Sequence, residues 1–171
     1  MSHSSTALIP SERPPEELAA FGIASTLLPV RLFLRSGATA AGAVFLRKIP
    51  SADRETESLG GRLNEPGVAF LPFAAGGRVE LVRLAAVAYV ELLDEAPEIA
   101  RLHALGAATE PVEIELANGE SLAGDLVAIA PPGRRRLSDL LNRGETFLPL
   151  EAPGRTLFVS RDAIVRVLGR Q

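Results

Sequence analysis

The sequence predicts a mainly β protein that contains two similar units, each made of a short helix and five short strands. The segment PVEIELANG at 111–119 resembles PVRLFLRSG at 29–37, which lies 82 positions earlier (111 − 29). A second echo, FLPL at 147–150, follows FLPF at 70–73 by 77 positions (147 − 70). Self-similarity at a nearly constant spacing indicates repeated structural units. Apolar and polar residues also alternate in 111–119, as they do in strands that bury one face.

The spacing of these echoes divides the 171 residues into a tail and two units. The Ser-rich residues 1–10 are predicted to be a disordered tail. The first unit is assigned to residues 11–92 and the second to residues 93–171. Units of roughly 80 residues bury only a thin core, so contact between the two is expected to help stabilise both.

Each unit is expected to begin with a short helix, at residues 11–22 and 94–106, because both segments have acidic residues early and a closing glycine. The polar loop at 48–67 is expected to be long, whereas 137–144 is expected to form about one helical turn. The predicted strands are 30–36, 39–47, 68–73, 78–84 and 87–92 in the first unit, and 112–116, 121–129, 146–150, 155–160 and 163–168 in the second.

Glycines predict a turn and a bend at the start of the second unit. Asn118 and Gly119 are typical of a tight hairpin turn, because both residues tolerate a positive φ. Gly124 interrupts the returning strand, where a glycine often marks a sharp bend or a close approach of another backbone.

The short helical turn of the second unit is expected to be capped at its start. Ser138 and Asp139 both carry oxygens that accept hydrogen bonds from free backbone N–H groups. Gly60 and Gly61 stand at the corresponding positions of the first unit, 78 positions earlier (138 − 60). We therefore predict that the first unit has a looser turn and that the second unit is the functional half.

The composition excludes several classes of protein. The formal net charge is −3, whereas broad nucleic-acid binders are usually basic. The absence of cysteine excludes disulfides, thiolate zinc sites and cysteine nucleophiles. We find no phosphate-binding glycine loop, metal-ligand cluster or nucleophile motif, and therefore predict no catalytic residue, no cofactor and no metal. Without a signal-peptide pattern or an apolar stretch of about 20 residues, the expected location is the cytoplasm, with no membrane contact.

Several of these residues resemble the signature motifs of the Sm-like (LSm/Hfq-like) small β-barrels. VEIELANG at 112–119, followed by Gly124, resembles the first motif, and LFVSRDAIVRV at 157–167 resembles the second. The resemblance implies two tandem five-stranded barrels of strongly bent sheet, each preceded by a short helix. The first unit matches the motifs at Gly37, Gly42 and 79–90.

A further pattern, RLSDLLN at 136–142 followed by FLPL, is similar to an uncharacterised bacterial domain family. Sm-like proteins often bind RNA through an asparagine after the bent strand and an Arg-Gly pair in the second motif. The nearest asparagines are Asn142 and Asn64, and Ser160-Arg161-Asp162 replaces the Arg-Gly pair in the second unit. The candidate contacts to a partner or to RNA are therefore Arg134, Arg135, Arg136, Asp139, Asn142 and Arg161. A basic run of this kind is also common in a merely solvated loop.

A charge difference between the two first strands indicates a candidate interface. The outward positions carry Arg31, Phe33 and Arg35 in the first unit, but Glu113 and Glu115 in the second. Opposite charges on equivalent surfaces can specify pairing between unlike halves, with Phe33 as an exposed apolar anchor. The alternative interpretation is drift on two solvated faces.

Together these observations favour a non-enzymatic cytoplasmic scaffold or protein-interaction module built from duplicated Sm-like units. The last two strands of each unit would leave open edges that pair with a neighbour within the chain or with another copy, so a homo-oligomer is expected. The alternative is an RNA-binding protein that uses the loop from Arg134 to Asn142 of the second unit.

Overall fold

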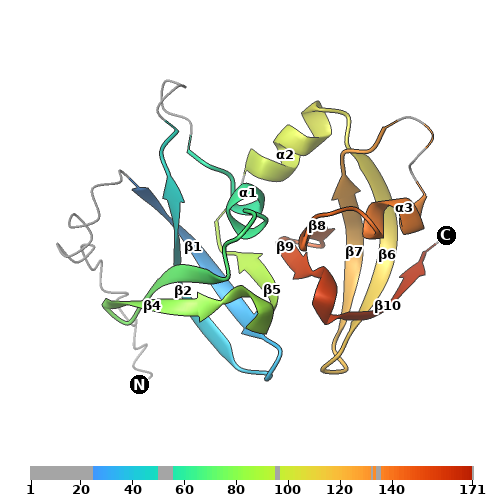
Figure 1. The fold of residues 1–171 in the computed structure, drawn as a ribbon. Coiled ribbons are helices and arrows are strands. Elements are labelled where there is room, and N and C mark those ends of the chain that lie inside the picture. The colour runs from blue at the N-terminus through green and yellow to red at the C-terminus, as the bar shows by residue number, and fades with distance from the viewer. Residues whose placement is uncertain (1–24, 50–55, 95–96, 132, 134–135, 171) are drawn as a thin grey trace, which may run out of the picture.

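The computed structural model describes residues 25–49, 56–94, 97–131, 133 and 136–170, and Figure 1 shows two β-rich halves side by side. The predicted tail and the helix expected at 11–22 lie outside the described residues. The N-terminal half contains β1 (Ser25–Leu34), β2 (Thr39–Arg47), α1 (Leu59–Leu63), β3 (Phe70–Ala75), β4 (Arg78–Arg83) and β5 (Val87–Leu92). The C-terminal half contains α2 (Pro97–Ala104), β6 (Ala108–Leu116), β7 (Ser121–Ala128), α3 (Leu137–Leu141), β8 (Phe147–Ala152), β9 (Arg155–Ser160) and β10 (Ile164–Gly169).

The mainly β class is confirmed, and all ten strands join one antiparallel sheet that is not closed. Their order is β10-β6-β7-β8-β9-β5-β1-β2-β3-β4, so the two halves meet where β9 pairs with β5. The outer strands of the described sheet are β4 at one end and β10 at the other. Each half contributes five neighbouring strands, and the order within one half repeats in the other.

The elements of the two halves correspond along the chain at the spacings of the sequence echoes. α1 and α3 are five residues each and begin 78 positions apart (137 − 59). β3, β4 and β5 correspond to β8, β9 and β10, each pair beginning 77 positions apart, as in 147 − 70. A residue and its counterpart in the other half can therefore be compared directly.

A glycine in the second strand of each half lets another backbone approach closely. A Cβ atom on Gly124 would lie 2.6 Å from the Glu151 carbonyl oxygen in β8. A Cβ atom on Gly42 would overlap the Ala74 carbonyl oxygen in β3. This confirms the close approach predicted for Gly124, and only glycine leaves the required space.

The sheet buries two hydrophobic clusters, which share residues across the β5–β9 pairing. The N-terminal cluster includes Val30, Leu32 and Phe73, but also Phe147 and Phe158 from the C-terminal half. The C-terminal cluster includes Ala88 and Tyr89 from β5. Neighbouring side chains of β9 therefore point into different clusters, because side chains of a strand alternate between its two faces. β5 also contributes to both clusters, with Ala88 and Tyr89 in the C-terminal one and Val87, Val90 and Leu92 in the N-terminal one. The result is that all six residues of β5 are buried.

The prediction that the first unit has the looser turn is wrong. α1 is a helix of the same length as α3, and Ser58 caps it by accepting a hydrogen bond from Gly61 N over 3.0 Å. In α3 the capping position is Arg136, which makes no side-chain capping bond, while Ser138 and Asp139 lie inside the helix. Gly60 and Gly61 are weak helix formers, so α1 depends on contacts with the rest of the chain for its stability.

Candidate protein-interaction site

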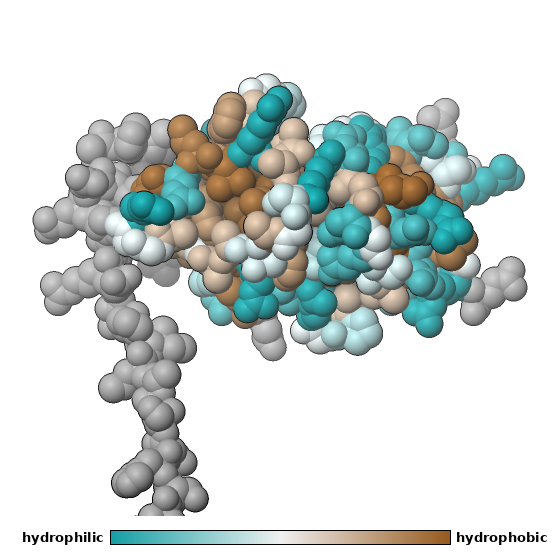
Figure 2. All heavy atoms as spheres, turned by 90° about the horizontal axis from the view of Figure 1, so that it is seen from below, coloured by the Kyte–Doolittle hydropathy of each residue, from teal (hydrophilic) through white to brown (hydrophobic). Residues whose placement is uncertain are grey.

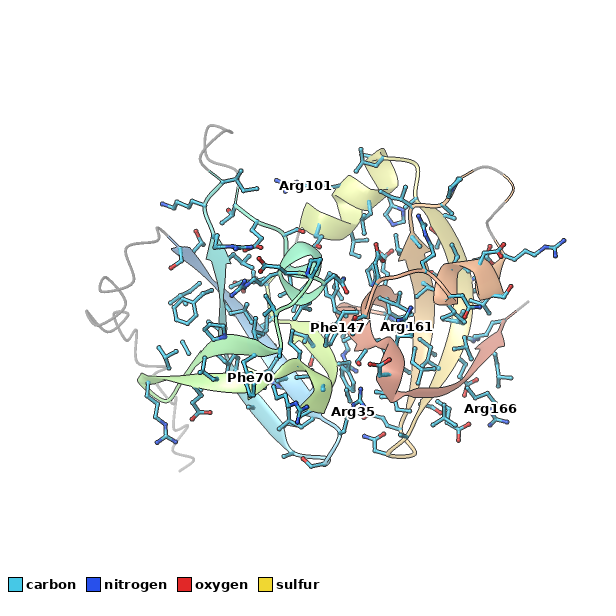
Figure 3. All side chains as sticks on the ribbon, in the orientation of Figure 1. Arg35, Phe70, Arg101, Phe147, Arg161 and Arg166 are labelled. Atoms are coloured by element: carbon cyan, nitrogen blue, oxygen red, sulfur yellow. The ribbon has the colours of Figure 1, made fainter. Side chains whose placement is uncertain are left out.

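The junction between the halves shows how a free edge of this sheet can be covered. Phe147 at the start of β8 is fully buried and Phe158 in β9 is 1% exposed. Both side chains belong to the N-terminal cluster, so the C-terminal half inserts two aromatic rings into the other half. Figure 3 shows Phe147 between the two halves. The paired residues of the junction are Tyr89 with Val159, Val90 with Phe158, and Glu91 with Leu157.

Asn64, which follows α1, joins the two halves through its side-chain amide. Its Oδ1 accepts hydrogen bonds from Thr146 N and Phe147 N, both over 2.8 Å. Its Nδ2 donates to Phe147 O over 2.9 Å. Asn64 thereby satisfies three backbone groups at the outer side of β8, which would otherwise be left without partners beside a buried ring. Leu59 and Leu63 of α1 are buried in the same cluster.

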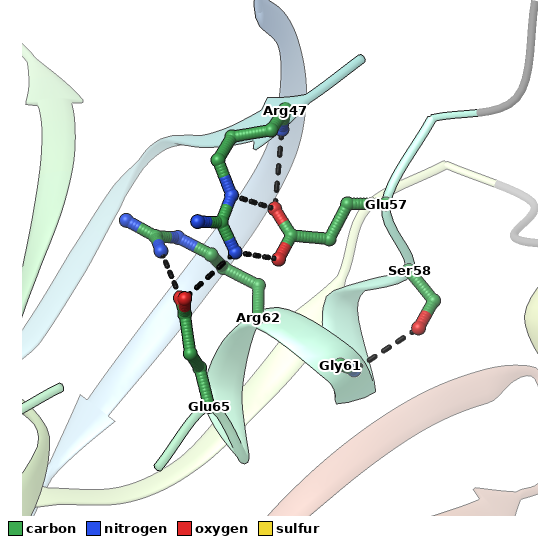
Figure 4. A network of polar contacts seen from close by, with 6 residues as sticks. All are labelled: Arg47, Glu57, Ser58, Gly61, Arg62 and Glu65. Carbon is green, nitrogen blue, oxygen red and sulfur yellow. Dashed lines mark hydrogen bonds and ion pairs between the residues drawn. The ribbon is translucent and has the colours of Figure 1, made fainter. Parts of the chain in front are cut away.

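A network of ion pairs holds the segment before and after α1 against β2 (Figure 4). Arg47 pairs with Glu57 at 2.7 Å and with Glu65 at 2.9 Å. Arg62 pairs with Glu65 at 2.5 Å. Burial opposes ionisation of the Glu57 carboxyl, but hydrogen bonds and charge from Arg47 outweigh it and lower the pKa of Glu57. The network thereby fixes the position from which Asn64 reaches β8.

Glu98 of α2 also ties the C-terminal half to α1. Its carboxylate accepts hydrogen bonds from Leu59 N over 3.0 Å and from Gly60 N over 2.8 Å. Partial burial of the carboxyl raises the pKa of Glu98, and these backbone bonds offset only part of that effect. Glu98 supplies the first-turn acceptors that the α1 sequence lacks, so the order of α1 depends on the other half of the chain.

The three predicted interface residues of β1 contact the junction within the chain. Arg31 lies 3.5 Å from Glu91, whose other oxygen accepts a 2.8 Å bond from Arg155 Nε in β9. Arg35 Nη2 donates to Ser160 Oγ over 3.3 Å. These contacts place positive charge of β1 and β9 around the buried carboxylate of β5, which needs such partners.

Phe33 is not the exposed anchor that the sequence predicts. Its ring stacks on Tyr89, with ring centroids 4.1 Å apart and planes 13° apart, and packs against the C-terminal cluster. The Tyr89 hydroxyl donates to Glu120 over 2.6 Å. Burial, and then this hydrogen bond, raise the pKa of Tyr89. The ring is covered because the other half of the chain occupies the face that β1 was expected to present to solvent.

Glu113 and Glu115 lie on β6, next to the outer strand β10. Glu115 pairs with Arg166 of β10 at 2.6 Å, and the Arg166 side chain is largely exposed whereas that of Glu115 is partly buried. Glu113 lies opposite Leu168 in the β6–β10 pairing. The two glutamates therefore do not meet Arg31 or Arg35 within the chain. Glu115 is already paired with Arg166, and Glu113 is exposed one strand in from the open end of the sheet.

The last hairpin of the N-terminal half, β3–β4, presents apolar side chains to solvent. Phe70 is 51% exposed, Val79 44% and Leu81 69%. Figure 2 shows hydrophobic residues gathered on the N-terminal half, on the left, beside a more hydrophilic C-terminal half. Phe70 is the counterpart of Phe147, 77 positions away (147 − 70), and Leu81 is the counterpart of Phe158 at the same spacing (158 − 81). The β3–β4 hairpin, at one end of the described sheet, thus carries on its surface the two positions that are buried at the junction in the other half.

The opposite outer strand, β10, has a matching set of partly covered residues. Val165 is 65% exposed and Leu168 is 47% exposed. Leu137 and Leu141 of α3 are only partly buried, whereas their counterparts Leu59 and Leu63 are almost fully buried. In the N-terminal half, Leu59 and Leu63 share a cluster with the rings of Phe147 and Phe158. The corresponding surface of the C-terminal half has no counterpart of these two rings packed on it among the described residues.

The predicted partner or RNA contacts are only partly brought together. Arg134 and Arg135 lie outside the described residues, and Arg136 is exposed at the start of α3. Asp139 and Asn142 line a hollow of about 420 Å³ together with Pro131 and Arg143. Arg161, in the turn before β10, does not line this hollow, but its guanidinium donates to the carbonyl oxygen of Arg143, which does. Within the described ranges, no group of three His, Cys, Asp or Glu side chains could hold a metal ion.

Three residues that organise the junction were not singled out from the sequence for this role, namely Asn64, Glu98 and Phe147. For Asn64 and Phe147, the repeat in the sequence could have indicated a counterpart in the other half. Asn64 and Asn142 follow corresponding helices, and Phe147 matches Phe70. The repeat alone does not say which member of each pair is covered, since coverage depends on the neighbouring half.

Comparisons with known proteins found no match to a family model, to a curated protein or to a solved structure. In the part of the chain that the structure describes, no helix is both long enough and apolar enough to cross a membrane. The function is therefore inferred from the contacts of the chain itself.

Proposed function

We propose that the protein is a non-enzymatic scaffold of two Sm-like units that associates with further copies through the open edges of its sheet. The observation that carries this proposal is the exposure of Phe70 and Leu81 on the β3–β4 edge. Their counterparts Phe147 and Phe158 are buried at the junction inside the other half. A strand edge with unpaired backbone groups and exposed apolar side chains is a template for pairing with another chain.

The same chain offers a surface that fits this edge. At the junction the fourth strand of the C-terminal half, β9, pairs with the fifth strand of the N-terminal half, β5. The outer strands are the fourth strand of the N-terminal half, β4, and the fifth strand of the C-terminal half, β10. A β4–β10 contact between copies would repeat the kind of pairing that β9 and β5 make within a copy. Because the two surfaces differ, the association is head-to-tail and yields rings or filaments.

The test is sedimentation velocity over a range of protein concentrations. The unmodified protein is expected to form species larger than the monomer, and Phe70→Ser with Leu81→Ser is expected to remain monomeric because its edge is polar. Leu105→Ser is the matched control, since Leu105 and Leu81 are both 69% exposed but Leu105 follows α2, away from the edge strands. The control should associate as the unmodified protein does.

A protein that is monomeric at every concentration, or a Phe70→Ser/Leu81→Ser variant that associates normally, would contradict the proposal. RNA binding predicts a different result. The larger species would then contain nucleic acid, and its affinity would fall steeply with salt concentration.

A further inference from the structure

Asn64 and Asn142 occupy the same backbone position in the two halves. Each follows a five-residue helix, α1 or α3, and its backbone N–H donates to the carbonyl oxygen four residues earlier. Their φ and ψ angles are −100° and 10° for Asn64 and −89° and 8° for Asn142. The backbones therefore direct both side chains alike, and any difference between them lies in the side chain itself.

The two side chains make different bonds. The Asn64 amide binds three backbone groups of Thr146 and Phe147 in the other half. The Asn142 amide instead turns back and donates to Ser138 O over 2.8 Å, within its own helix, and Asn142 is exposed. Rotation about its side-chain bonds is all that Asn142 needs in order to reach outward as Asn64 does.

The backbone that corresponds to Thr146 and Phe147 is that of Ala69 and Phe70, 77 positions earlier (147 − 70). Arg161 N donates to Thr146 O over 2.7 Å, and Leu84 N donates to Ala69 O over 2.9 Å. Corresponding residues of the β8–β9 and β3–β4 hairpins therefore make the same hydrogen bonds between their strands. In an antiparallel pair, residues alternate between those bonded to the partner strand and those directed away from it. The N–H and C=O of Phe70 are therefore directed away from β4, as those of Phe147 are from β9.

We infer that Asn142 of one copy clamps the backbone of Ala69 and Phe70 of a second copy, and that the Phe70 ring of that copy covers Leu137 and Leu141. This inference rests on the proposed self-association and specifies its register. The pairing expected between copies follows from the β5–β9 pairing, when each residue is replaced by its counterpart 77 positions away in the other half, as in 166 − 89. It places Arg166 opposite Val82, Val167 opposite Leu81, and Leu168 opposite Glu80.

The charges at the two edges fit this arrangement. Within the chain, Glu91 lies between Arg31 and Arg155. At the contact between copies the corresponding positions hold Leu168, Glu113 and Arg78. The buried carboxylate is thus replaced by an apolar side chain, and the β1 arginine is replaced by Glu113, which would lie near Arg78 of the other copy. Within one copy Arg78 pairs with Glu80 over 3.1 Å. Arg78 can then pair with a carboxylate from each copy, Glu80 of its own and Glu113 of the other, so the reversed charge of the first strand is still met by a positive group.

Cysteine cross-linking tests the register, because the chain has no cysteine of its own. Glu80→Cys and Leu168→Cys are prepared as separate proteins, one with a tag that changes its size, and are oxidised alone and mixed. Paired residues of an antiparallel sheet have Cα atoms within disulfide range. The mixture is expected to give a mixed disulfide dimer. Leu105→Cys with Glu80→Cys is the control and should give none.

Homodimers of Glu80→Cys alone would indicate that two β4 edges meet symmetrically, which would overturn the inference. Absence of the mixed dimer from a protein that sediments as an oligomer would also overturn it, while leaving self-association intact.

The clamp itself is tested with Asn142→Ala and Asn142→Asp. Three lost hydrogen bonds are expected to weaken association roughly tenfold to hundredfold in the alanine variant. Asn142→Asp keeps the acceptors but not the donor, so its affinity should lie between those of the alanine variant and the unmodified protein. The thermal midpoint measured at concentrations where each protein is monomeric should not change, because among the described residues the Asn142 side chain bonds only to Ser138 O in one copy. Unchanged affinity in Asn142→Ala would show that this residue does not act as a clamp.

Discussion

The junction and the open edges of the same sheet differ in what covers them far more than in local structure. β8 and β9 have the same lengths as β3 and β4 and make the same hydrogen bond at the start of the hairpin. Phe147 is nevertheless fully buried, whereas Phe70 is 51% exposed. α1 and α3 have equal lengths, yet Asn64 binds the other half and Asn142 binds its own helix. Corresponding segments of the two halves thus carry the same contact residues. Those at the junction already contact the other half of the chain, whereas those at the open edges do not.

The largest expected contrast is between Phe147→Ala and Phe70→Ala. Removal of the fully buried Phe147 ring leaves a cavity in the N-terminal cluster, so we expect a loss of about 3–5 kcal/mol in the free energy of unfolding. Phe70→Ala should change the unfolding free energy of the monomer by less than about 0.5 kcal/mol. Urea unfolding monitored by circular dichroism at low protein concentration measures both. Similar losses in the two variants would mean that the edge is already covered within the monomer.

Asn64→Ala is expected to have the next largest effect. The variant leaves Thr146 N, Phe147 N and Phe147 O without their partner beside the buried junction, which should cost roughly 2–3 kcal/mol of unfolding free energy. Hydrogen exchange should also become faster at these two amides. Asn142→Ala in the monomer is the comparison, because within the described part of the chain the Asn142 side chain bonds only to Ser138 O. If the two alanine variants are equally stable, the Asn64 amide does not hold the halves together.

The smallest predicted effect is a pH dependence that involves Glu98. Because partial burial raises the pKa of Glu98 in the folded protein, its contribution to stability is fully present below its unfolded value of 4.5. That contribution is lost as the pH rises through the folded pKa. The difference in unfolding free energy between the unmodified protein and Glu98→Gln should therefore decrease as the pH rises from about 4 to 7.

Glu57 provides a control of opposite sign. Its pKa is lowered, since Arg47 outweighs the effect of burial, so its contribution is present above 4.5 and is lost as the pH falls through its folded pKa. The corresponding difference for Glu57→Gln should increase with pH over the lower part of the same range. Parallel pH profiles for the two variants would contradict the assignment of these shifts.

Much of the local structure was predictable from the sequence. The strands predicted at 39–47, 87–92 and 155–160 have those bounds in the structure, because alternation and turn residues act over a few positions. Gly119 has a φ of 84°, as expected of the Asn-Gly turn. The close approach at Gly124 was also predictable, because a glycine inside a strand leaves space that any side chain would fill.

The errors concern contacts between distant segments. Gly60 and Gly61 predict a loose turn, but Glu98, almost 40 residues away, bonds to the start of α1. Phe33 alternates as an outward residue of β1, but Tyr89 and the C-terminal cluster cover it. Neither contact has a local signal, because the covering residues come from another part of the sheet.

The sequence by itself determined the strands, the close approach at Gly124 and the correspondence between the halves, since propensities and periodicity depend on near neighbours. Only the tertiary structure decided which copy of each repeated feature is occupied. Asn64 and Asn142, or Phe147 and Phe70, are the same residue types in the same local setting. The physical reason is the sheet order. The pairing of β9 with β5 buries one edge of each half, and β4 and β10 are left at the two ends with their binding groups exposed.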